Sequence, residues 1–301
     1  MDLMSECYKG VEEISLDEIR EVLKVKGSKG DGFVRFESDK AEGLKTVLNI
    51  FEVLGEFKFS SFEDLVSKVL SLDFSFLKND FFVSVKREGS HDFNSQDVRL
   101  ELFRKLSEKY GKRAVFKGYK QCFYVLIKDS RCYVGKFVFE DLCKRGYKVR
   151  TSRESINACV ANVLLRFSGY SLDGLVDYFC KDGVILIEAG GGYAFDYREC
   201  NVYSTKINAK LAKVKVNFSD FESVASAISV VPCPSKGLSE KKASRLVSEF
   251  FSNCLKKVKK DVCVMCRNEK FVLGLAKGFK LVKKGKILIG DSEYSLLLFK
   301  V

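Results

Sequence analysis

The sequence predicts an α/β protein in which a smaller α+β part precedes a mainly parallel, doubly wound sheet. The chief observation is that strand and helix patterns alternate in the second half of the chain. A second is that acidic residues end several of these strands, at the edge where such sheets bind ligands. The expected elements are a helix near 153–168, a strand at 174–179, a helix at 184–190, a strand at 193–196, a helix at 203–213 and a strand at 214–218.

The first half predicts shorter, mixed elements. Apolar residues at helical spacing indicate a helix over 10–25, a strand comes next over 30–38, and a second helix is expected over 39–54. A third helix, over 60–72, begins with serines that can cap it. A strand at 80–87, an amphipathic helix at 95–112 that stops at a glycine, and two strands joined by a turn at Asp129-Ser130 complete this half.

The charge balance predicts a polyanionic partner. The 301 residues carry a formal net charge of +12 and an isoelectric point near 9.1. Such an excess favours nucleic acid, although lysine-rich surfaces also serve solubility alone. No apolar run approaches the ~20 residues that span a bilayer, and the first residues lack the layout of a secretory signal. We therefore expect a cytoplasmic protein that does not interact with membranes.

The cysteines indicate buried thiols and no metal site. Eleven are scattered singly through apolar segments, as in a protein of the reducing cytosol. The motif CVMC at 263–266 is one CxxC pair without a second, and His91, the sole histidine, lies far away in the sequence. We therefore expect no zinc site.

The stretch DYFCKDGVILIEA, residues 177–189, has the outline of a corner that holds a nucleotide-like ligand. Asp177 ends an apolar strand, and VILIEA begins a buried helix. The loop between them, CKDG, has one glycine where such corners usually have two or more. A plain strand-to-helix turn is the alternative interpretation.

Several motifs resemble those of one enzyme family. The stretches FFVSVKREGSHDFNSQDV and CYVGKFVFEDLCKRGYKVR resemble the THUMP domain of RNA-modifying enzymes. The rest of the chain, from residue 151 onward, resembles the methyltransferase domain of the THUMP-containing tRNA guanine-N2 methyltransferases, so the similarity covers nearly the whole sequence. It implies a ferredoxin-like domain over 1–75, a THUMP domain over 76–144, and a Rossmann-like class I methyltransferase domain over 145–301, with a mostly parallel seven-stranded sheet and S-adenosylmethionine as cofactor.

The cofactor motifs of that family are only partly present. The family's corner is Asp-Pro-Phe-Cys-Gly-Ser-Gly-Thr, and this chain replaces its proline by Tyr178, its first glycine by Lys181 and its threonine by Val184. A side chain at 181 obstructs the close approach that glycine allows, so we expect weakened cofactor binding. The resemblance implies that Asp196 contacts the ribose and Asp220 the adenine. The full expected cofactor set is Asp177, Phe179, Gly183, Asp196 and Asp220.

The catalytic motif is degenerate. Exocyclic-amine methyltransferases carry Asn/Asp-Pro-Pro-Tyr, whose first side chain accepts hydrogen bonds from the base amine and whose ring stacks on the base. The corresponding residues here are Val231, Pro232, Cys233 and Pro234, of which only Pro232 matches the family. Loss of one oriented hydrogen-bonding group can slow a reaction by ~10²–10³-fold. Cys233 is a poor candidate nucleophile, because this domain contains no histidine to activate it.

The resemblance implies that the THUMP region and its N-terminal neighbour bind the acceptor stem of tRNA. Clustered cations suit phosphate contacts, although a single surface lysine is more often only a solvated charge. The expected RNA-binding residues are Lys86, Arg87, His91, Asn94, Lys105, Lys109, Arg113, Lys117, Lys120, Arg145, Lys148 and Arg150.

Three functions fit these patterns. The first is a tRNA-binding relative of the family in which methyl transfer is weakened or lost. The second is an active S-adenosylmethionine-dependent tRNA (guanine-N2) methyltransferase with a divergent active site. The third is a non-catalytic interaction subunit that works beside a protein partner.

Overall fold

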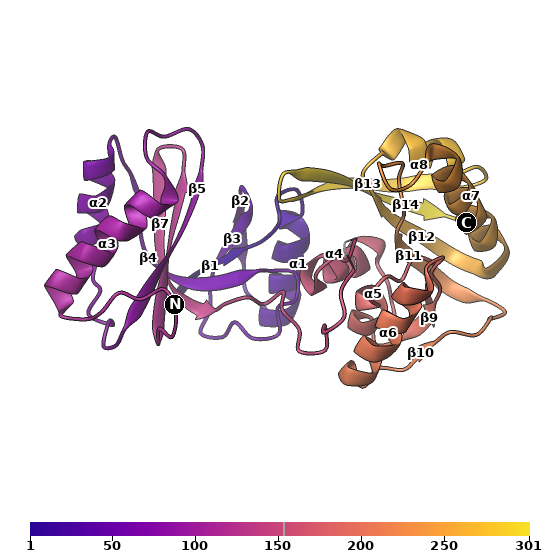
Figure 1. Cartoon of the computed structure of the whole chain (residues 1–301), viewed down its shortest axis with the longest axis horizontal. Coiled ribbons are helices and arrows are strands. Elements are labelled where there is room, and N and C mark those ends of the chain that lie inside the picture. Colours follow the sequence, from indigo (N-terminus) through magenta and orange to yellow (C-terminus); the bar gives the residue numbers. More distant parts are fainter. Residues whose placement is uncertain (153) are drawn as a thin grey trace. The chain divides into compact units, whose positions relative to one another are not determined.

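The computed structural model describes residues 1–152 and 154–301. These residues form two compact units, and the chain passes between them several times before residue 49 (Figure 1). The first unit comprises 1–5, 35–41 and 49–140, and the second comprises 6–34, 42–48 and 141–301. The three domains expected from the sequence stay a prediction. The last passage between the units, at 140/141, lies four residues from the expected boundary at 144/145.

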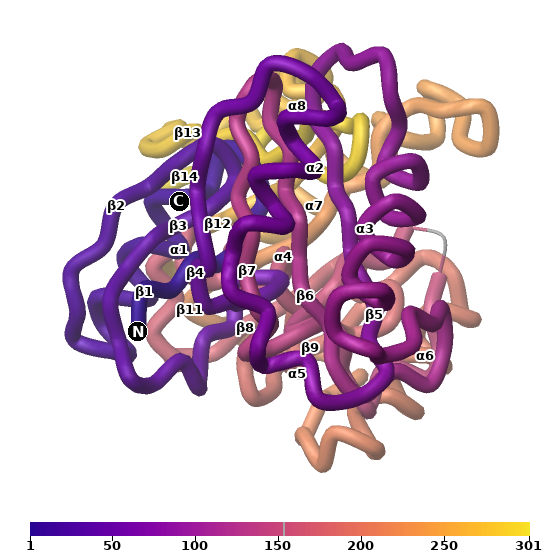
Figure 2. Tube along the Cα trace, turned by 90° about the vertical axis from the view of Figure 1, so that its left-hand side faces the viewer, coloured from indigo at the N-terminus to yellow at the C-terminus, as the bar shows by residue number. Residues whose placement is uncertain are grey.

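The first unit is a sheet with two helices on one face (Figures 1 and 2). Antiparallel pairs β4–β7 and β6–β7 are followed by the parallel pair β6–β5. Leu65 and Leu102 from the two helices pack with Val83 and Phe123 of the sheet in one buried cluster. The elements are β4 (Asn49–Lys58), α2 (Phe62–Leu70), β5 (Phe81–Glu88), α3 (Ser95–Tyr110), β6 (Gln121–Lys128) and β7 (Arg131–Phe139).

The helix expected over 39–54 is wrong. Residues 49–58 form β4, a ten-residue strand that pairs with β7 along most of its length. Ile50, Phe51 and Val53 are residue types that favour strands, and this long-range pairing overrides the local helical spacing. At Gly55 a Cβ would come within 2.7 Å of the Leu72 side chain, so the strand passes close to the residues that follow α2.

The seven-stranded sheet to which these strands belong has the order β2-β3-β1-β4-β7-β6-β5. Its remaining strands are β1 (Asp2–Glu6), β2 (Gly27–Gly30) and β3 (Phe33–Glu37). The expected strand over 30–38 is confirmed as β3, whereas β1 and β2 have no counterpart among the predicted elements.

The second unit contains the expected mostly parallel sheet, in the order β10-β9-β8-β11-β12-β14-β13. Strands β10 to β12 pair in parallel, and β14 is antiparallel to both of its neighbours. The elements are α1 (Glu12–Leu23), α4 (Ala158–Ser168), β8 (Leu175–Asp177), α5 (Val184–Glu188), β9 (Gly192–Ala194), α6 (Glu199–Ala212), β10 (Val216–Asn217), β11 (Val224–Val230), α7 (Glu240–Lys257), β12 (Val258–Cys266), α8 (Glu269–Leu275), β13 (Lys280–Ile289) and β14 (Ser292–Lys300).

This sheet is buried on both faces, as parallel sheets generally are. Alternate residues of its central strands enter two separate hydrophobic clusters: Ile228 and Leu296 lie in the one with α4 and α5, and Ala227 and Leu297 in the one with α7 and α8. Three layers, helix–sheet–helix, result.

The same alternation separates the cysteines of the CVMC motif. Cys263 belongs to the cluster with α4, and Cys266 to the cluster with α7. Burial raises the pKa of each thiol to about 12. Nowhere in 1–152 or 154–301 do three or more His, Cys, Asp or Glu side chains gather in a way that could hold a metal ion. No helix in these ranges is both long and apolar enough to span a bilayer.

Helix α1, near the start of the sequence, is fixed within the second unit by a buried carboxylate. Glu18, only 2% exposed, accepts hydrogen bonds from the backbone N–H of Lys45 and from the N–H and hydroxyl of Thr46, at 3.0, 2.8 and 2.6 Å. Arg166 of α4 pairs with it at 3.4 Å and also with Glu21 at 2.7 Å. The carboxylate therefore joins α1, the 42–48 segment and α4.

Replacement of this carboxylate should destabilise the second unit. In a Glu18→Ala variant, Thr46 and Arg166 lose a buried partner, and such losses cost about 3–5 kcal/mol. Urea unfolding followed by circular dichroism should show a clear fall in the midpoint. The control is Glu13→Ala on the same helix, whose half-exposed carboxylate pairs with Arg20 and Lys29 and should change stability by at most about 1 kcal/mol. Equal midpoints for the two variants would contradict this role of Glu18.

Candidate functional site

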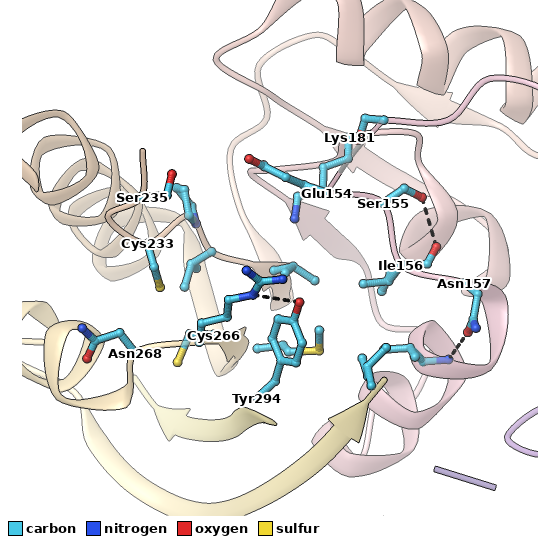
Figure 3. Close-up of a pocket in the computed structure, with 18 of the residues that line it drawn as sticks. Glu154, Ser155, Ile156, Asn157, Lys181, Cys233, Ser235, Cys266, Asn268 and Tyr294 are labelled. Carbon is cyan, nitrogen blue, oxygen red and sulfur yellow. Dashed lines mark hydrogen bonds between the residues drawn. The ribbon is translucent and has the colours of Figure 1, made fainter. Parts of the chain in front are cut away.

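The second unit has a cavity of about 630 Å³ at the carboxyl ends of β8, β11 and β12 (Figure 3). Strand β8 continues to α5 in one hydrophobic cluster, and β11 continues to α7 in the other, on the opposite face of the sheet. This reversal is the position where doubly wound sheets bind ligands. The lining residues include Lys148, Thr151, Glu154, Ser155, Asn157, Lys181, Val231, Pro232, Cys233, Pro234, Met265, Arg267, Asn268 and Tyr294.

The corner after β8 has the expected strand–loop–helix form. Asp177 is buried and accepts hydrogen bonds from the Ser229 hydroxyl (2.6 Å) and the Phe179 N–H (3.1 Å). Burial raises its pKa to about 7, although the Ser229 hydrogen bond acts in the opposite direction. Gly183 has φ 82°, and a Cβ there would lie 2.6 Å from the Thr205 side chain, so this one glycine is required.

Lys181 occupies the corner where the resembled family has a glycine. It adopts φ 53°, a left-handed conformation that costs a non-glycine residue about 1–2 kcal/mol. The residue is 8% exposed and its side chain lines the cavity, with the amino end directed into it (Figure 3). Space that a glycine would leave open is therefore filled.

Asp196, the expected ribose ligand, is engaged by the backbone of the corner. One carboxylate oxygen accepts the Lys181 N–H at 3.0 Å, and the other accepts the Arg198 N–H at 2.9 Å. The acid therefore lies beside the corner, as the sequence predicts. Both of its oxygens already accept hydrogen bonds from the protein's own backbone.

A second hollow, of about 280 Å³, lies beside Asp196 and Asp220. Aromatic rings dominate its walls, and Tyr178, which replaces the family's proline, stacks on Phe195 with ring centroids 5.5 Å apart. The hydroxyl of Tyr178 is buried and has no hydrogen-bond partner among the residues that the structure describes. The exposed carboxylate of Asp220 pairs with Lys257, which holds its pKa below the usual value. Of the expected cofactor residues, Phe179, Asp196 and Asp220 line this second hollow, whereas Asp177 and Gly183 are not among the residues that line either one.

The four residues after β11 offer the cavity no side-chain oxygen. Val231 is 4% exposed, packs in the cluster with α7, and donates its N–H to the Met265 carbonyl at 3.1 Å. Pro232 is buried, and Cys233 and Pro234 are half-buried at the cavity wall. A base amine at this point would find no side chain that accepts its proton.

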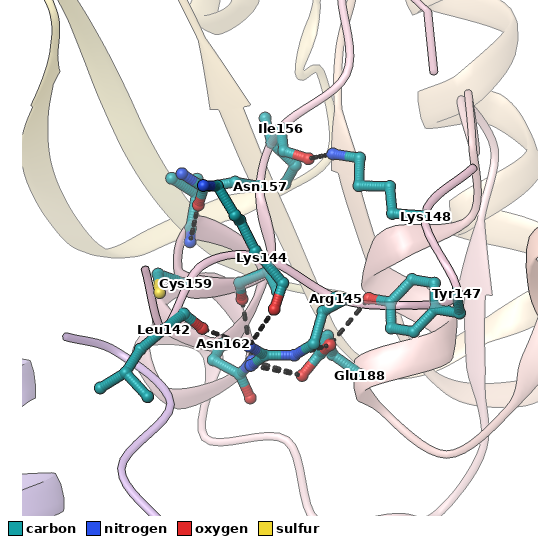
Figure 4. Close-up of polar contacts among 12 residues, drawn as sticks. Leu142, Lys144, Arg145, Tyr147, Lys148, Ile156, Asn157, Cys159, Asn162 and Glu188 are labelled. Atoms are coloured by element: carbon teal, nitrogen blue, oxygen red, sulfur yellow. Dashed lines mark hydrogen bonds and ion pairs between the residues drawn. The ribbon is translucent and has the colours of Figure 1, made fainter. Parts of the chain in front are cut away.

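The segment over 142–152 is tied to the corner by ionic contacts (Figure 4). Arg145 pairs with Glu188 of α5 at 2.9 Å, and the Tyr147 hydroxyl donates to the same carboxylate at 2.7 Å. Lys148 lies 3.4 Å from Asp182 and also donates to the Ile156 carbonyl. Arg145 and Lys148, expected to contact RNA, are therefore used inside the second unit, whereas Arg150 has an exposed side chain.

Four other expected RNA-binding residues of the first unit make local contacts. Arg87 donates to Nδ1 of His91 at 2.9 Å, and Nε2 of His91 contacts the Asp129 carbonyl at 2.7 Å. Asn94 caps α3 through a capping box with Asp97. Lys86 lies 3.5 Å from Glu88.

The cations of α3 and the loop after it are more accessible. Lys109, Arg113, Lys117 and Lys120 are exposed and Lys105 is half-exposed, while Arg113 also pairs with Asp80 at 2.6 Å. The Phe116 ring lies within this sequence and is 58% exposed. A cationic surface that includes an exposed ring suits phosphate contact and base stacking.

Several residues of the site were missed from the sequence. Arg267 and Asn268 come directly after β12, and Arg267 donates to the Tyr294 hydroxyl at 2.9 Å across the cavity wall. The sequence signal for these two residues was their position directly after the apolar run VCVMC, which is typical of a buried parallel strand. The contacts of Asp182 with Lys148 and Ser155 had no sequence signal, because they join segments about 30 residues apart.

Comparisons with known proteins support the fold. The sequence matches no protein-family model, and no curated protein is significantly similar to it. The structure is similar to that of TrmN from Thermus thermophilus, with 19% identity, a TM-score of 0.82 and 99% of each chain covered. A possible methylase from Clostridium difficile 630 also has 19% identity and a TM-score of 0.82, with 99% of this chain and 97% of that chain covered.

A third similar structure is a putative methyltransferase complexed with SAH, at 18% identity and a TM-score of 0.78, with 99% of this chain and 97% of that one covered. At such identities the likeness shows a shared fold. This chain therefore shares its fold with TrmN, with a possible methylase and with a putative methyltransferase.

Loss of the carboxylate that holds the cavity wall should weaken the second unit. Burial alone would raise the pKa of Glu188, but hydrogen bonds from Asn162, Tyr147 and Arg145 outweigh it and lower the pKa. A lowered pKa means that this carboxylate stabilises the fold above about pH 4.3, and that the contribution is lost as the pH falls through the lower, folded-state pKa. Glu188→Ala should cost about 3–5 kcal/mol at pH 7.

The measurement is urea unfolding at pH 7 and at successively lower pH, down to pH 3. The difference between Glu188→Ala and the unmodified protein should shrink over the acidic range. Glu293→Ala is the control, because that carboxylate pairs with Lys286 at the surface, both being more than half exposed, and should cost at most about 1 kcal/mol. A Glu188→Ala difference that is independent of pH would argue against an ionised Glu188 in the folded protein.

Proposed function

We propose that this protein binds tRNA and has the fold of an S-adenosylmethionine-dependent methyltransferase, with methyl transfer weakened or lost. One observation carries the proposal: the residues after β11 line the cavity with Val231, Pro232, Cys233 and Pro234, none of which bears a side-chain oxygen or aromatic ring to hold a base amine. The carbonyls of Val231 and Pro232 are the remaining acceptors there.

Two features of the corner support weakened cofactor binding. Lys181 places a long side chain where the resembled family has a glycine, and both oxygens of Asp196 hold backbone N–H groups. A ribose that approaches Asp196 competes with these bonds. The structural neighbour complexed with SAH supports a cofactor of this chemistry for the shared fold.

RNA binding is supported by the resemblance to THUMP proteins and by the accessible cations of α3 and the loop after it. The exposed Phe116 ring lies among these cations in the sequence. The proposed contacts centre on Lys105, Lys109, Arg113, Lys117 and Lys120. The local contacts of Arg87, His91 and Asn94 shape the neighbouring loop, and only their remaining donors are available to RNA.

The second candidate is an active tRNA (guanine-N2) methyltransferase. The observation in its favour is that both hollows, of about 630 and 280 Å³, remain open beside the corner. Backbone carbonyls would then hold the base amine. A non-catalytic subunit beside a protein partner is the third candidate, and it shares the inactive site of the first.

Transfer RNA should bind with an affinity that depends strongly on salt. Six or more phosphate contacts would lower affinity by ~10³-fold or more between ~50 and ~200 mM salt. Reversal of charge in the double variant Arg113→Glu, Lys117→Glu should weaken binding to all tRNAs alike. The control, Lys213→Glu, reverses an exposed charge in the second unit and should bind normally. Filter binding measures all three proteins, and absent or salt-insensitive binding would refute tRNA recognition.

Methyl transfer by the unmodified protein should be slow or absent. With tRNA and labelled S-adenosylmethionine, we expect incorporation to be at least ~10²–10³-fold slower than ordinary enzyme turnover, because the amine acceptor is missing. The restoring variant carries Lys181→Gly and Val184→Thr in the corner, with Val231→Asn, Cys233→Pro and Pro234→Tyr after β11. Asp182 is kept, since it pairs with Lys148.

The corner substitutions alone serve as the control, and should strengthen cofactor binding without restoring turnover. The full set is the minimum that would restore activity. Turnover of ~1 per second by the unmodified protein would establish the second candidate instead, with the base held by backbone alone.

A further inference from the structure

Lys181 is a buried cation that forms no ion pair with the described residues, although the carboxylates of Glu154, Asp177, Asp196 and Asp182 lie near enough to favour its charged form. The residue is 8% exposed, and its side chain lines the 630 Å³ cavity. Among the residues that the structure describes, no carboxylate lies within 4.0 Å of its amino group. A charge taken out of water without a partner is strongly unfavourable, so buried charges are normally paired.

The acids nearest to Lys181 are all committed elsewhere. Asp177 accepts from Ser229 and Phe179, and Asp196 accepts from two backbone N–H groups. Asp182 pairs with Lys148 and accepts from the Ser155 hydroxyl, and Glu154 lies 3.7 Å from Arg198. Of the cations close to the corner, Lys148 and Arg198 therefore have partners and Lys181 does not.

The space in front of Lys181 is large enough for a ligand. A cavity of about 630 Å³ lies within the range of small-molecule sites. Its walls combine apolar groups, such as Pro232 and Met265, with the Tyr294 ring, which Arg267 holds in place. Lys148 and Arg267 also line the cavity, but Lys148 pairs with Asp182 and the Arg267 side chain is exposed. The buried Lys181 amino group therefore suits a molecule with one charged end.

We propose that this cavity binds a small carboxylate-bearing molecule, whose carboxylate pairs with the Lys181 amino group. The negative charge of a carboxylate complements the Lys181 ammonium group. A phosphate would need further donors, but the Lys181 N–H is bonded to Asp196 and the Gly183 N–H to the Cys180 carbonyl. The apolar body of the ligand then lies against Pro232 and the Tyr294 ring.

The proposal does not depend on loss of methyl transfer. A carboxylate can come from a free metabolite, or from the amino-acid end of S-adenosylmethionine or SAH. In either case Lys181 converts a glycine position into an anion-recognition position.

The charge state of Lys181 supports this use of the site. Burial lowers its pKa, although the carboxylates of Glu154, Asp177, Asp196 and Asp182 act in the opposite direction, so the empty site penalises the ammonium form. The unmodified protein should therefore gain stability relative to Lys181→Met as the pH rises toward the unfolded-state pKa of ~10.4. A bound carboxylate acts in the opposite direction, because it favours the charged amine.

The test is thermal unfolding of the full-length protein at pH 7 in sodium acetate or sodium chloride at equal ionic strength. Acetate is a carboxylate small enough to reach Lys181, and its binding does not depend on the structure of the rest of the natural ligand. We expect acetate at ~10 times its Kd to raise the melting temperature by a few degrees. In Lys181→Met, which keeps the length and removes the charge, this rise should disappear.

Lys213→Met is the matched control, since Lys213 is another lysine at positive φ, 57°, but is exposed; it should retain the acetate effect. Lys181→Gly provides a second variant suited to the left-handed backbone, and it should lose the effect too. No acetate-specific rise in the unmodified protein, or an equal rise in the two Lys181 variants, would overturn the proposal.

Addition of SAH separates the two sources of carboxylate. If SAH raises the melting temperature and Lys181→Met abolishes that rise, the ligand is the cofactor's amino-acid end. If acetate acts and SAH does not, the ligand is a separate carboxylate. Both results support Lys181 as the anion site, and they leave the methyl-transfer measurement to decide the proposed function independently.

Discussion

The hydrogen bond between the Ser229 hydroxyl and the buried Asp177 carboxylate joins the two strands from which the site diverges. The same hydroxyl accepts the Tyr178 N–H at 3.0 Å, so β8 and β11 are fastened at their carboxyl ends. Beyond this point one strand continues to a helix on one face of the sheet, and the other continues to a helix on the opposite face. The cavity exists because the chain separates there, and the corner, the residues after β11 and the segment that contains Lys148 and Thr151 all border it.

Sequence patterns predicted the parts of this arrangement that depend on local chemistry. The single glycine at 183 and the apolar helix after it were visible because left-handed backbone and burial both restrict residue choice. Interactions between distant segments left no such trace. Residues 49–58 have apolar spacing compatible with a helix, and only pairing with β7 makes them a strand. Likewise, nothing local distinguishes Arg145, which pairs with Glu188, from an exposed cation such as Arg150.

Net charge is therefore an incomplete guide to where a polyanion binds. Many of the 52 lysines and arginines have carboxylate partners nearby: Lys257, Lys260, Lys284 and Lys286 each form an ion pair in the second unit. What distinguishes Lys181 from all of these is its burial, since a solvated lysine needs no partner and a buried one does. The position of a cation within the fold, more than the total number of positive residues, therefore decides whether it is available to bind an anionic ligand.

The path of the chain has a consequence for biosynthesis. Residues 6–34 belong to the second unit, where the Lys9 carbonyl accepts the Leu288 N–H at 3.0 Å and Tyr8 contacts Asn157. At ~5–20 residues per second, a ribosome needs roughly 15–55 s to proceed from Lys9 to Leu288. Throughout that interval the segment that carries α1 lacks its partner in β13, while the strands and helices over 49–140 are already complete enough to fold. The unit that holds the cavity is thus begun early and closed last, after the segment over 49–140 has been synthesised.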